Sequence, residues 1–149
     1  MKSIRNSLLS ILAAIPLIWI SSAIYQNKTF DLQLHDTYFV ISPYTLAQIF
    51  TISLIGVLSL YFVLNRGNGY LNRALTAVHA IVVLTIAIVL GVLFYFLSAY
   101  AEVERYSSDF TFINSLASTF IILVILSVVI FIINLLVSLV QRVIKQKAV

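Results

Sequence analysis

The sequence predicts an all-α, polytopic membrane protein with four transmembrane helices, and three observations carry this prediction. Of the 149 residues, 62% are apolar and only 9% are charged, whereas about a quarter of the residues in an average soluble domain are charged. The apolar residues form four long continuous runs rather than short segments of alternating polarity, which favours helices over transmembrane strands. The chain contains no cysteine, which excludes a disulfide scaffold and a thiolate metal site.

The four runs lie within a single membrane domain that covers residues 1–149. A helix that spans a bilayer needs about 20 mainly apolar residues, because the hydrocarbon core is about 30 Å thick. We therefore expect helices at residues 7–25, 43–64, 74–100 and 110–140. The last run is longer than one crossing requires, so we expect this helix to tilt or to project beyond the membrane.

The first run has two interpretations. Lys2 and Arg5 precede it and the small residues 21–23 follow its apolar part, as in a cleaved signal peptide. However, the apolar stretch is long for a signal peptide, and Trp19 lies near its outer end, where an interfacial aromatic residue is expected. We favour a retained helix.

Dividing the charges between the two ends of the predicted helices indicates the orientation. Seven of the nine basic residues fall on one side: Lys2, Arg5, Arg66, Arg73, Arg142, Lys145 and Lys147. The other side holds all five acids: Asp31, Asp36, Glu102, Glu104 and Asp109. Because cytoplasmic loops carry the excess of Lys and Arg, both termini are predicted to be inside, with an outer polar segment at residues 26–42.

The same division determines which partners are expected. The net charge of +4 reports topology, and no basic–aromatic patch outside the membrane indicates a nucleic-acid partner. The expected partners are the lipid bilayer and either other membrane subunits or further copies of this chain. The expected location is a bacterial inner membrane.

The outer segment carries the chemical signal in this sequence. The carboxylates of Asp31 and Asp36 could bind a hard cation, with His35 as a supporting partner. His35 and Asp36 are adjacent, so they could share one metal only from a loop. Alternatively, Asp36 caps the second helix or forms a local turn, and His35 anchors the segment at the interface.

A run of eight residues in this segment resembles subunit I of the haem–copper oxidases, the cytochrome c oxidase family. The family's stretch reads approximately D-x-x-L-H-D-T-Y-[FY]-V-V-A-H-F-H. The matching residues are Asp31, Leu34, His35, Asp36, Thr37, Tyr38, Phe39 and Val40. Asn72 and His79 also resemble the spacing of an asparagine and a histidine in a later helix of that family. The four helices would then correspond to the C-terminal part of the subunit.

The resemblance implies that His35 and Asp36 contact haem propionates and that, with Asp31, they lie at a magnesium site. The histidines that hold haem iron in the family fall on Pro43 and Thr45 here, and neither side chain can ligate iron. The resemblance therefore implies a relative that has lost, or never had, oxygen reduction, so an enzyme is less expected than a non-catalytic protein.

Two functions follow from this resemblance. The first is a non-catalytic accessory or assembly subunit of a membrane complex, of the respiratory chain if the family likeness extends that far. Its recognition element would be formed by Asp31, His35, Asp36, Thr37 and Tyr38. The alternative is a haem- or metal-binding membrane module that uses His35 and Asp36, with haem or magnesium as cofactor, although the sequence requires neither. An enzymatic share in oxygen reduction is the least favoured function.

A few polar residues and glycines lie within the apolar runs. His79 is separated from His35 by the thickness of the membrane, so the two cannot ligate one metal. His79 is either a functional group or a hydrogen-bond partner of a neighbouring helix. The other polar residues within the runs, Gln48, Asn114 and Asn134, are expected to form hydrogen bonds between helices. Gly56 and Gly91 are expected to allow close approach of helices.

Overall fold

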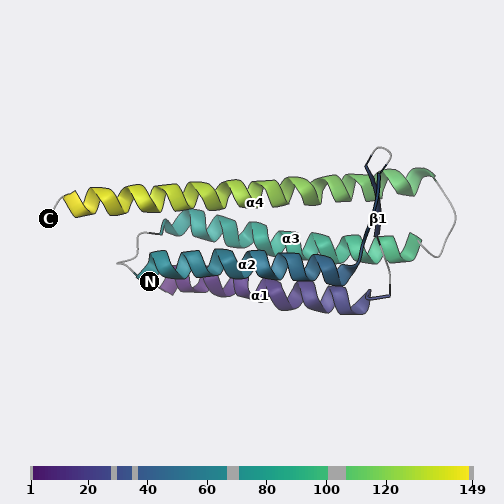
Figure 1. Ribbon diagram of the computed structural model, residues 1–149, viewed down its shortest axis with the longest axis horizontal. Coiled ribbons are helices and arrows are strands. Elements are labelled where there is room, and N and C mark those ends of the chain that lie inside the picture. Colours follow the sequence, from purple (N-terminus) through teal and green to yellow (C-terminus); the bar gives the residue numbers. More distant parts are fainter. Residues whose placement is uncertain (1, 28–29, 35–36, 67–70, 101–106, 148–149) are drawn as a thin grey trace.

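The computed structural model describes residues 2–27, 30–34, 37–66, 71–100 and 107–147. Four helices run side by side along one axis, and two short strands lie at one end of them (Figure 1). The helices are α1 (Lys2–Ile24), α2 (Pro43–Arg66), α3 (Arg73–Tyr100) and α4 (Ser107–Lys147). The strands are β1 (Phe30–Leu34) and β2 (Thr37–Ile41). The four predicted helices are confirmed, and each is long and apolar enough to span a membrane.

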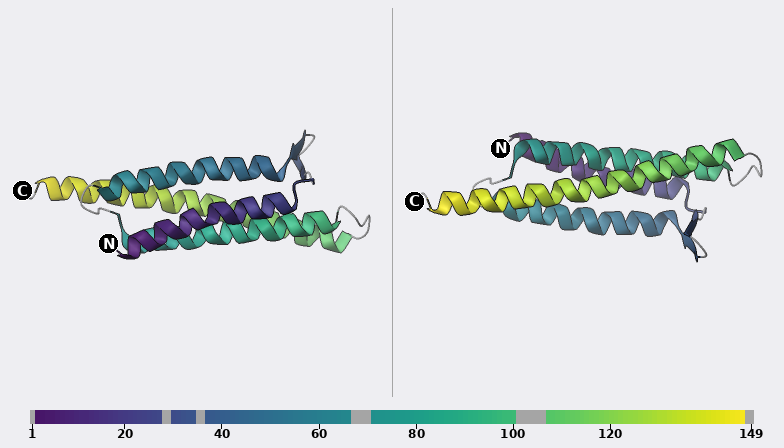
Figure 2. Two further views of the ribbon diagram at one scale, coloured as in Figure 1. Left: turned by 90° about the horizontal axis from the view of Figure 1, so that it is seen from below. Right: turned by 90° about the horizontal axis from the view of Figure 1, so that it is seen from above.

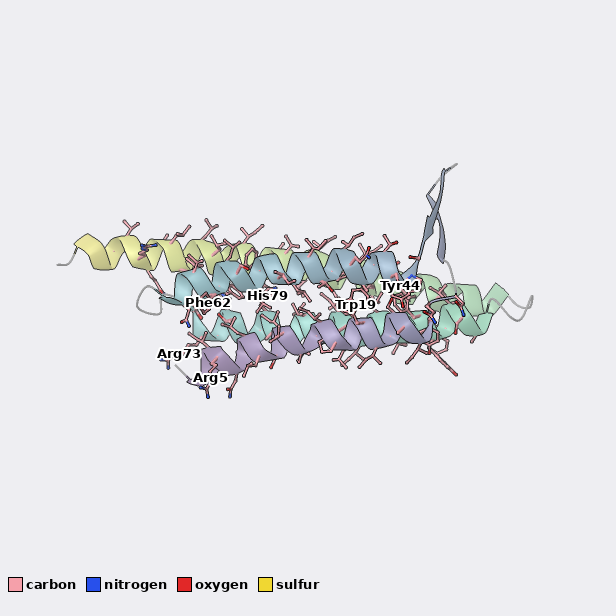
Figure 3. The ribbon with its side chains drawn as sticks, turned by 60° about the horizontal axis from the view of Figure 1, so that its bottom comes forward. Arg5, Trp19, Tyr44, Phe62, Arg73 and His79 are labelled. Atoms are coloured by element: carbon pink, nitrogen blue, oxygen red, sulfur yellow. The ribbon has the colours of Figure 1, made fainter. Side chains whose placement is uncertain are left out.

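Successive helices alternate in direction, so that both chain termini lie at the same end of the bundle (Figure 1). Arg5 and Arg73 lie toward this end, whereas Trp19 and Tyr44 lie toward the end that carries the strands (Figure 3). The arginines of α1 and α3 are therefore grouped at one end of the bundle, as the division of charges along the sequence predicts.

The helices pack in a definite order. α1 packs most extensively against α3, α3 also packs against α4, and α1 packs against α2. Seen from above, α4 lies over α2 and α3 (Figure 2). α3 supplies much of the buried core, including Val83, Leu90 and Phe94. The backbones of α2 and α4 make little contact, so side chains connect these two helices.

The two glycines play different roles. A Cβ atom added at Gly91 would lie 2.9 Å from Ser21 Oγ, so Gly91 allows the close approach of α3 to α1, as predicted. Gly56 has no atom of another residue within 4 Å of such a Cβ atom. The same prediction is wrong for Gly56, because this residue lies on an exposed side of α2.

The strands are an element that the sequence analysis did not predict. β1 and β2 pair in an antiparallel hairpin, in which Phe30 pairs with Ile41 and Leu34 with Thr37. The alternation of apolar and polar residues from Phe30 to Leu34, followed by the β-branched and aromatic residues of β2, is a strand pattern. The outer polar segment is thus not a plain loop.

Local side chains set the starts of two helices. The backbone N–H of Thr45 donates to Ser42 Oγ at 3.1 Å, so Ser42 caps α2. The N–H groups of Ala74 and Leu75 donate to Asn72 Oδ1, which caps α3 in the same way. Asp36, the expected cap of the second helix, lies outside the described residues, and Ser42 occupies the capping position of α2.

Candidate functional site

A group of polar side chains meets inside the bundle, between α2, α3 and α4. Tyr61 of α2, His79 of α3 and Asn134 of α4 are all buried. The Tyr61 hydroxyl lies 2.8 Å from His79 Nδ1, and Asn134 Nδ2 donates to the Tyr61 hydroxyl across 3.2 Å. Along the bundle, His79 lies between the labelled Arg73 and the labelled Trp19 (Figure 3). Side chains of three helices are therefore bonded at one place.

Further residues extend this buried network. His79 Nε2 lies 3.0 Å from Ser127 Oγ on α4. Asn134 Nδ2 also donates to Thr76 Oγ1 at 2.9 Å, and the Thr76 hydroxyl donates to the Asn72 carbonyl oxygen at 2.8 Å. Polar side chains within a bilayer must find partners in the protein, and such bonds hold membrane helices together. The network therefore stabilises the association of α2, α3 and α4.

The direction of each hydrogen bond can be assigned from its neighbours. The Tyr61 oxygen accepts from Asn134, and His79 Nδ1 is the acceptor that leaves the buried Tyr61 proton bonded among the described residues, so we assign this proton to His79 Nδ1. His79 is then the tautomer with its proton on Nε2, and this N–H donates to Ser127 Oγ. The donors form a directed chain from Asn134 through Tyr61 and His79 to Ser127.

Within the described part of the network, the carbonyl oxygen of the Asn134 side chain is an unsatisfied acceptor. Asn134 Oδ1 is buried and has no hydrogen-bond partner among the described residues. The proton of Thr76 bonds to Asn72 and that of Tyr61 bonds to His79, so neither hydroxyl can donate to this oxygen. Asn134 therefore incurs a desolvation cost, which its two donated hydrogen bonds offset.

An apolar cavity of about 210 Å³ adjoins the network. His79 and Ser127 belong to both the network and the cavity wall. Phe131 also lines the cavity. Its ring packs against the network, with its centroid 5.4 Å from that of Tyr61 and 5.9 Å from that of His79. The polar network thus ends at the edge of an apolar space.

The geometry around His79 determines what this histidine can do. Both ring nitrogens take part in hydrogen bonds to neighbouring helices, which is the second of the two roles expected for it. In this arrangement neither nitrogen presents a free lone pair to a metal ion. Within the described ranges, no group of three or more His, Cys, Asp or Glu residues is placed to hold a metal.

The outer segment, where the sequence places its candidate site, forms the hairpin. Asp31 pairs with Val40 and Gln33 with Tyr38 along the two strands. His35 and Asp36 lie outside the described residues. The hairpin lies at the end of the bundle far from Arg73 (Figure 3), so the structure does not bring Asp31 or Tyr38 together with His79.

Pro43 and Thr45, at which the resemblance would place haem-ligand histidines, have a local role here. Pro43 is the first residue of α2, where its missing N–H leaves no intrahelical hydrogen bond unmade. Thr45 provides the N–H that Ser42 caps. These two residues start a helix, and their side chains offer no nitrogen ligand.

Sequence reasoning found part of the buried network. Asn134 was expected to bond between helices, and this is confirmed. The same expectation is wrong for Gln48, which is exposed on α2, and the side chain of Asn114 lies outside the described ones. Tyr61 and Ser127 were missed. For the α3 side of the network the sequence does contain a signal: His79 follows Thr76 by three residues, which places both polar side chains on one face of the helix.

The chain was compared with protein-family models, curated proteins and solved structures, and it matches none of them. The class of the protein therefore follows from the fold and the network. The chain forms a bundle of four helices, each long and apolar enough to cross a membrane. Side-chain hydrogen bonds connect three of these helices.

Proposed function

We propose that this chain is a non-catalytic accessory subunit of a membrane complex, to which it attaches through the projecting end of α4. Both termini would face the cytoplasm of a bacterial cell, with the hairpin on the outer side. One structural observation carries the proposal: α4 continues past the end of the other three helices, and it exposes four apolar side chains there beside Gln141 and Arg142.

The length of the projection follows from the buried network. Thr76 lies three residues after the start of α3 at Arg73, and it is bonded to Asn134. Because α3 and α4 are antiparallel, Arg73 lies level with a point about one turn beyond Asn134 on α4. The helix then continues to Lys147, a projection of roughly 15 Å at 1.5 Å per residue. Figure 1 shows this end of α4 extending beyond the other helices.

The surface of the projection indicates the kind of partner. Leu139, Val140, Val143 and Ile144 are exposed there. They lie beyond the level of Arg73, where the polar boundary of the membrane is expected, and no other described helix covers them. An apolar surface of this kind outside the hydrocarbon core is typical of a protein contact. Arg142 is exposed among these residues, so a partner helix with an acidic side chain at the same level would complement it.

The resemblance of the outer segment supports the class of complex. The run from Asp31 to Val40 is similar to haem–copper oxidase subunit I, so we place the partner among respiratory membrane proteins. The hairpin that contains this run lies at the opposite end of the bundle from the α4 projection (Figure 1). The hairpin would therefore be a second recognition element on the outer surface.

Purification of the tagged chain from its native membrane in a mild detergent tests this proposal. We expect other membrane subunits to be recovered with it in a fixed ratio. The double variant Leu139→Ala/Ile144→Ala is expected to release them. The matched control is Ile122→Ala/Ile125→Ala, which changes exposed residues of α4 that lie before the projection, and it is expected to retain the complex.

Three outcomes would overturn the proposal. Recovery of the chain alone at several detergent strengths would show that there is no stable complex. Recovery of copies of this chain without any other subunit would identify a homo-oligomer instead. Release by both double variants would place the contact on the lipid-facing surface in general and not on the projection.

A further inference from the structure

The cavity beside the buried network has walls from all four helices and a mouth on one side. The lining residues are Ile18, Ile49, Phe50, Ser53, Leu54, Val57, His79, Val83, Ile86, Val124, Ser127, Val128 and Phe131. Ile18, Leu54 and Val83 are buried and form the floor. Ile49 of α2 and Val128 of α4 are 53% and 52% exposed, so the cavity reaches the surface between these two helices.

Two aromatic pairs frame this mouth. Phe50 of α2 lies edge-on to Phe120 of α4, with ring centroids 5.6 Å apart. Further along the same two helices, Tyr61 lies edge-on to Phe131 at 5.4 Å. α2 and α4 run in the same direction, so the two pairs bridge them at successive levels, and the cavity-lining residues Val57 and Val124 lie between these levels. The mouth therefore faces sideways from the bundle, toward the expected lipid.

The polar groups in the wall are not equivalent. Ser53 donates its proton to the Ile49 carbonyl oxygen at 2.8 Å, within its own helix. With the tautomer of His79 assigned above, Ser127 Oγ accepts from His79 Nε2, which leaves the Ser127 proton available. Among the described residues no acceptor receives this proton. The directed chain of donors from Asn134 thus ends in a hydroxyl group whose residue lines an apolar cavity.

We propose that this cavity binds a small, neutral molecule dissolved in the bilayer, with one ring-sized apolar group and a carbonyl oxygen that accepts the Ser127 proton. The volume fits, because an apolar cavity of about 150 Å³ in another protein holds benzene and this one measures about 210 Å³. No charged side chain lines it, so an ionised ligand would be unfavourable there. This proposal does not depend on the accessory-subunit proposal, because it concerns a different part of the molecule.

The hydrogen bond to the ligand can be tested with two probes of similar shape. Acetophenone has a ring and a carbonyl oxygen, whereas isopropylbenzene has the ring without an acceptor. The purified full chain in lipid nanodiscs, labelled at its Val and Leu methyl groups, is titrated with each probe and followed by NMR. We expect saturable shifts at the Val83 and Val124 methyls, with acetophenone bound about tenfold more tightly after correction for partition into lipid.

Variants separate the polar contact from the shape of the cavity. Ser127→Ala removes the donor with little change in volume, and it is expected to abolish the preference for acetophenone without weakening isopropylbenzene. Val124→Phe fills the cavity and is expected to weaken both probes. Its matched control, Val129→Phe, changes an exposed residue of α4 and is expected to leave both affinities unchanged.

An independent signature comes from the carbonyl stretch of isotope-labelled acetophenone. A hydrogen bond from Ser127 lowers this frequency for the bound probe, and Ser127→Ala is expected to restore it. The proposal is overturned if the methyl shifts do not saturate, or if the preference for acetophenone survives in Ser127→Ala. Equal loss of binding in Val124→Phe and Val129→Phe would also overturn it.

Discussion

Asn134 of α4 donates a hydrogen bond to the hydroxyl of Tyr61 on α2 across 3.2 Å, and it joins two helices whose backbones make little contact. On one side of the cavity mouth, the two helices are connected by this hydrogen bond and by the contact between the Tyr61 and Phe131 rings. On the other side they are connected by the Phe50–Phe120 pair. The closure of the bundle on this side therefore depends on a few side chains. Substitution of one of them should have a measurable effect.

The first prediction concerns Tyr61→Phe. This change removes the acceptor of one Asn134 N–H and the donor to His79 Nδ1, so His79 Nδ1 loses its partner and Asn134 Nδ2 keeps only its bond to Thr76. We expect the free energy of unfolding to fall by about 1–3 kcal/mol. Unfolding in mixed micelles of mild detergent and dodecyl sulfate, followed by circular dichroism, measures it.

The matched control for this substitution is Tyr44→Phe. The Tyr44 hydroxyl donates to Gln26 Oε1 at 3.1 Å at an exposed position. Its removal should change the free energy of unfolding by less than about 0.5 kcal/mol. Equal effects of the two variants would contradict the structural role of the buried network.

The second prediction compares the two glycines of α2 and α3. Alanine favours a helix over glycine by about 1 kcal/mol. Gly56→Ala should gain most of this amount, because its new methyl group meets no other atom within 4 Å. Gly91→Ala should gain less or destabilise, because the methyl would lie 2.9 Å from Ser21 Oγ. The same unfolding assay measures both.

A double variant isolates the contact at Gly91. In a Ser21→Ala background the Oγ atom is absent, and Gly91→Ala should recover the gain seen at Gly56. If Gly91→Ala is as stabilising as Gly56→Ala in the unmodified chain, α1 and α3 do not approach as closely as described.

The third prediction concerns the start of α2. Ser42→Ala removes the acceptor for the Thr45 N–H and should cost about 1 kcal/mol of stability. Hydrogen exchange should rise at the first amides of α2 and stay unchanged at those of α3, which Asn72 caps. Ser42→Asp keeps an acceptor at this place and should be close to neutral. A destabilised Ser42→Asp variant would rule out capping as the cause.

Nearly all of the helical fold could be predicted from the sequence, because hydropathy alone defines segments of about 20 apolar residues. The hairpin was missed because five-residue strands carry a short signal beside long helices. The buried network was predicted only in part, at Asn134 and as one of two roles for His79. Tyr61 is one of eight tyrosines and looks like an interfacial residue in the sequence. Its role depends on which helices are its neighbours. The arrangement of the helices is decided by packing between them, which cannot be deduced from the sequence of one helix.

The fourth prediction tests the orientation proposed from the charges. The chain has no cysteine, so single variants can be labelled without background. In intact bacterial cells, a thiol reagent that does not cross membranes should label Asn27→Cys, at the hairpin end. It should label Asn6→Cys and Gln141→Cys only after the membrane is opened. Labelling of Asn6→Cys in intact cells would reverse the proposed orientation.

The preference of α1 for α3 has a consequence for how the protein is made. Helices enter the membrane in the order of their synthesis, and α1 and α2 emerge first as neighbours in the chain. The most extensive contact of α1 is with α3, so α1 lacks its main partner until the ribosome has completed α3. During that interval Ser21 and its surroundings face lipid or the insertion machinery. Nascent chains halted before Tyr100 should therefore be the form most exposed to membrane quality control.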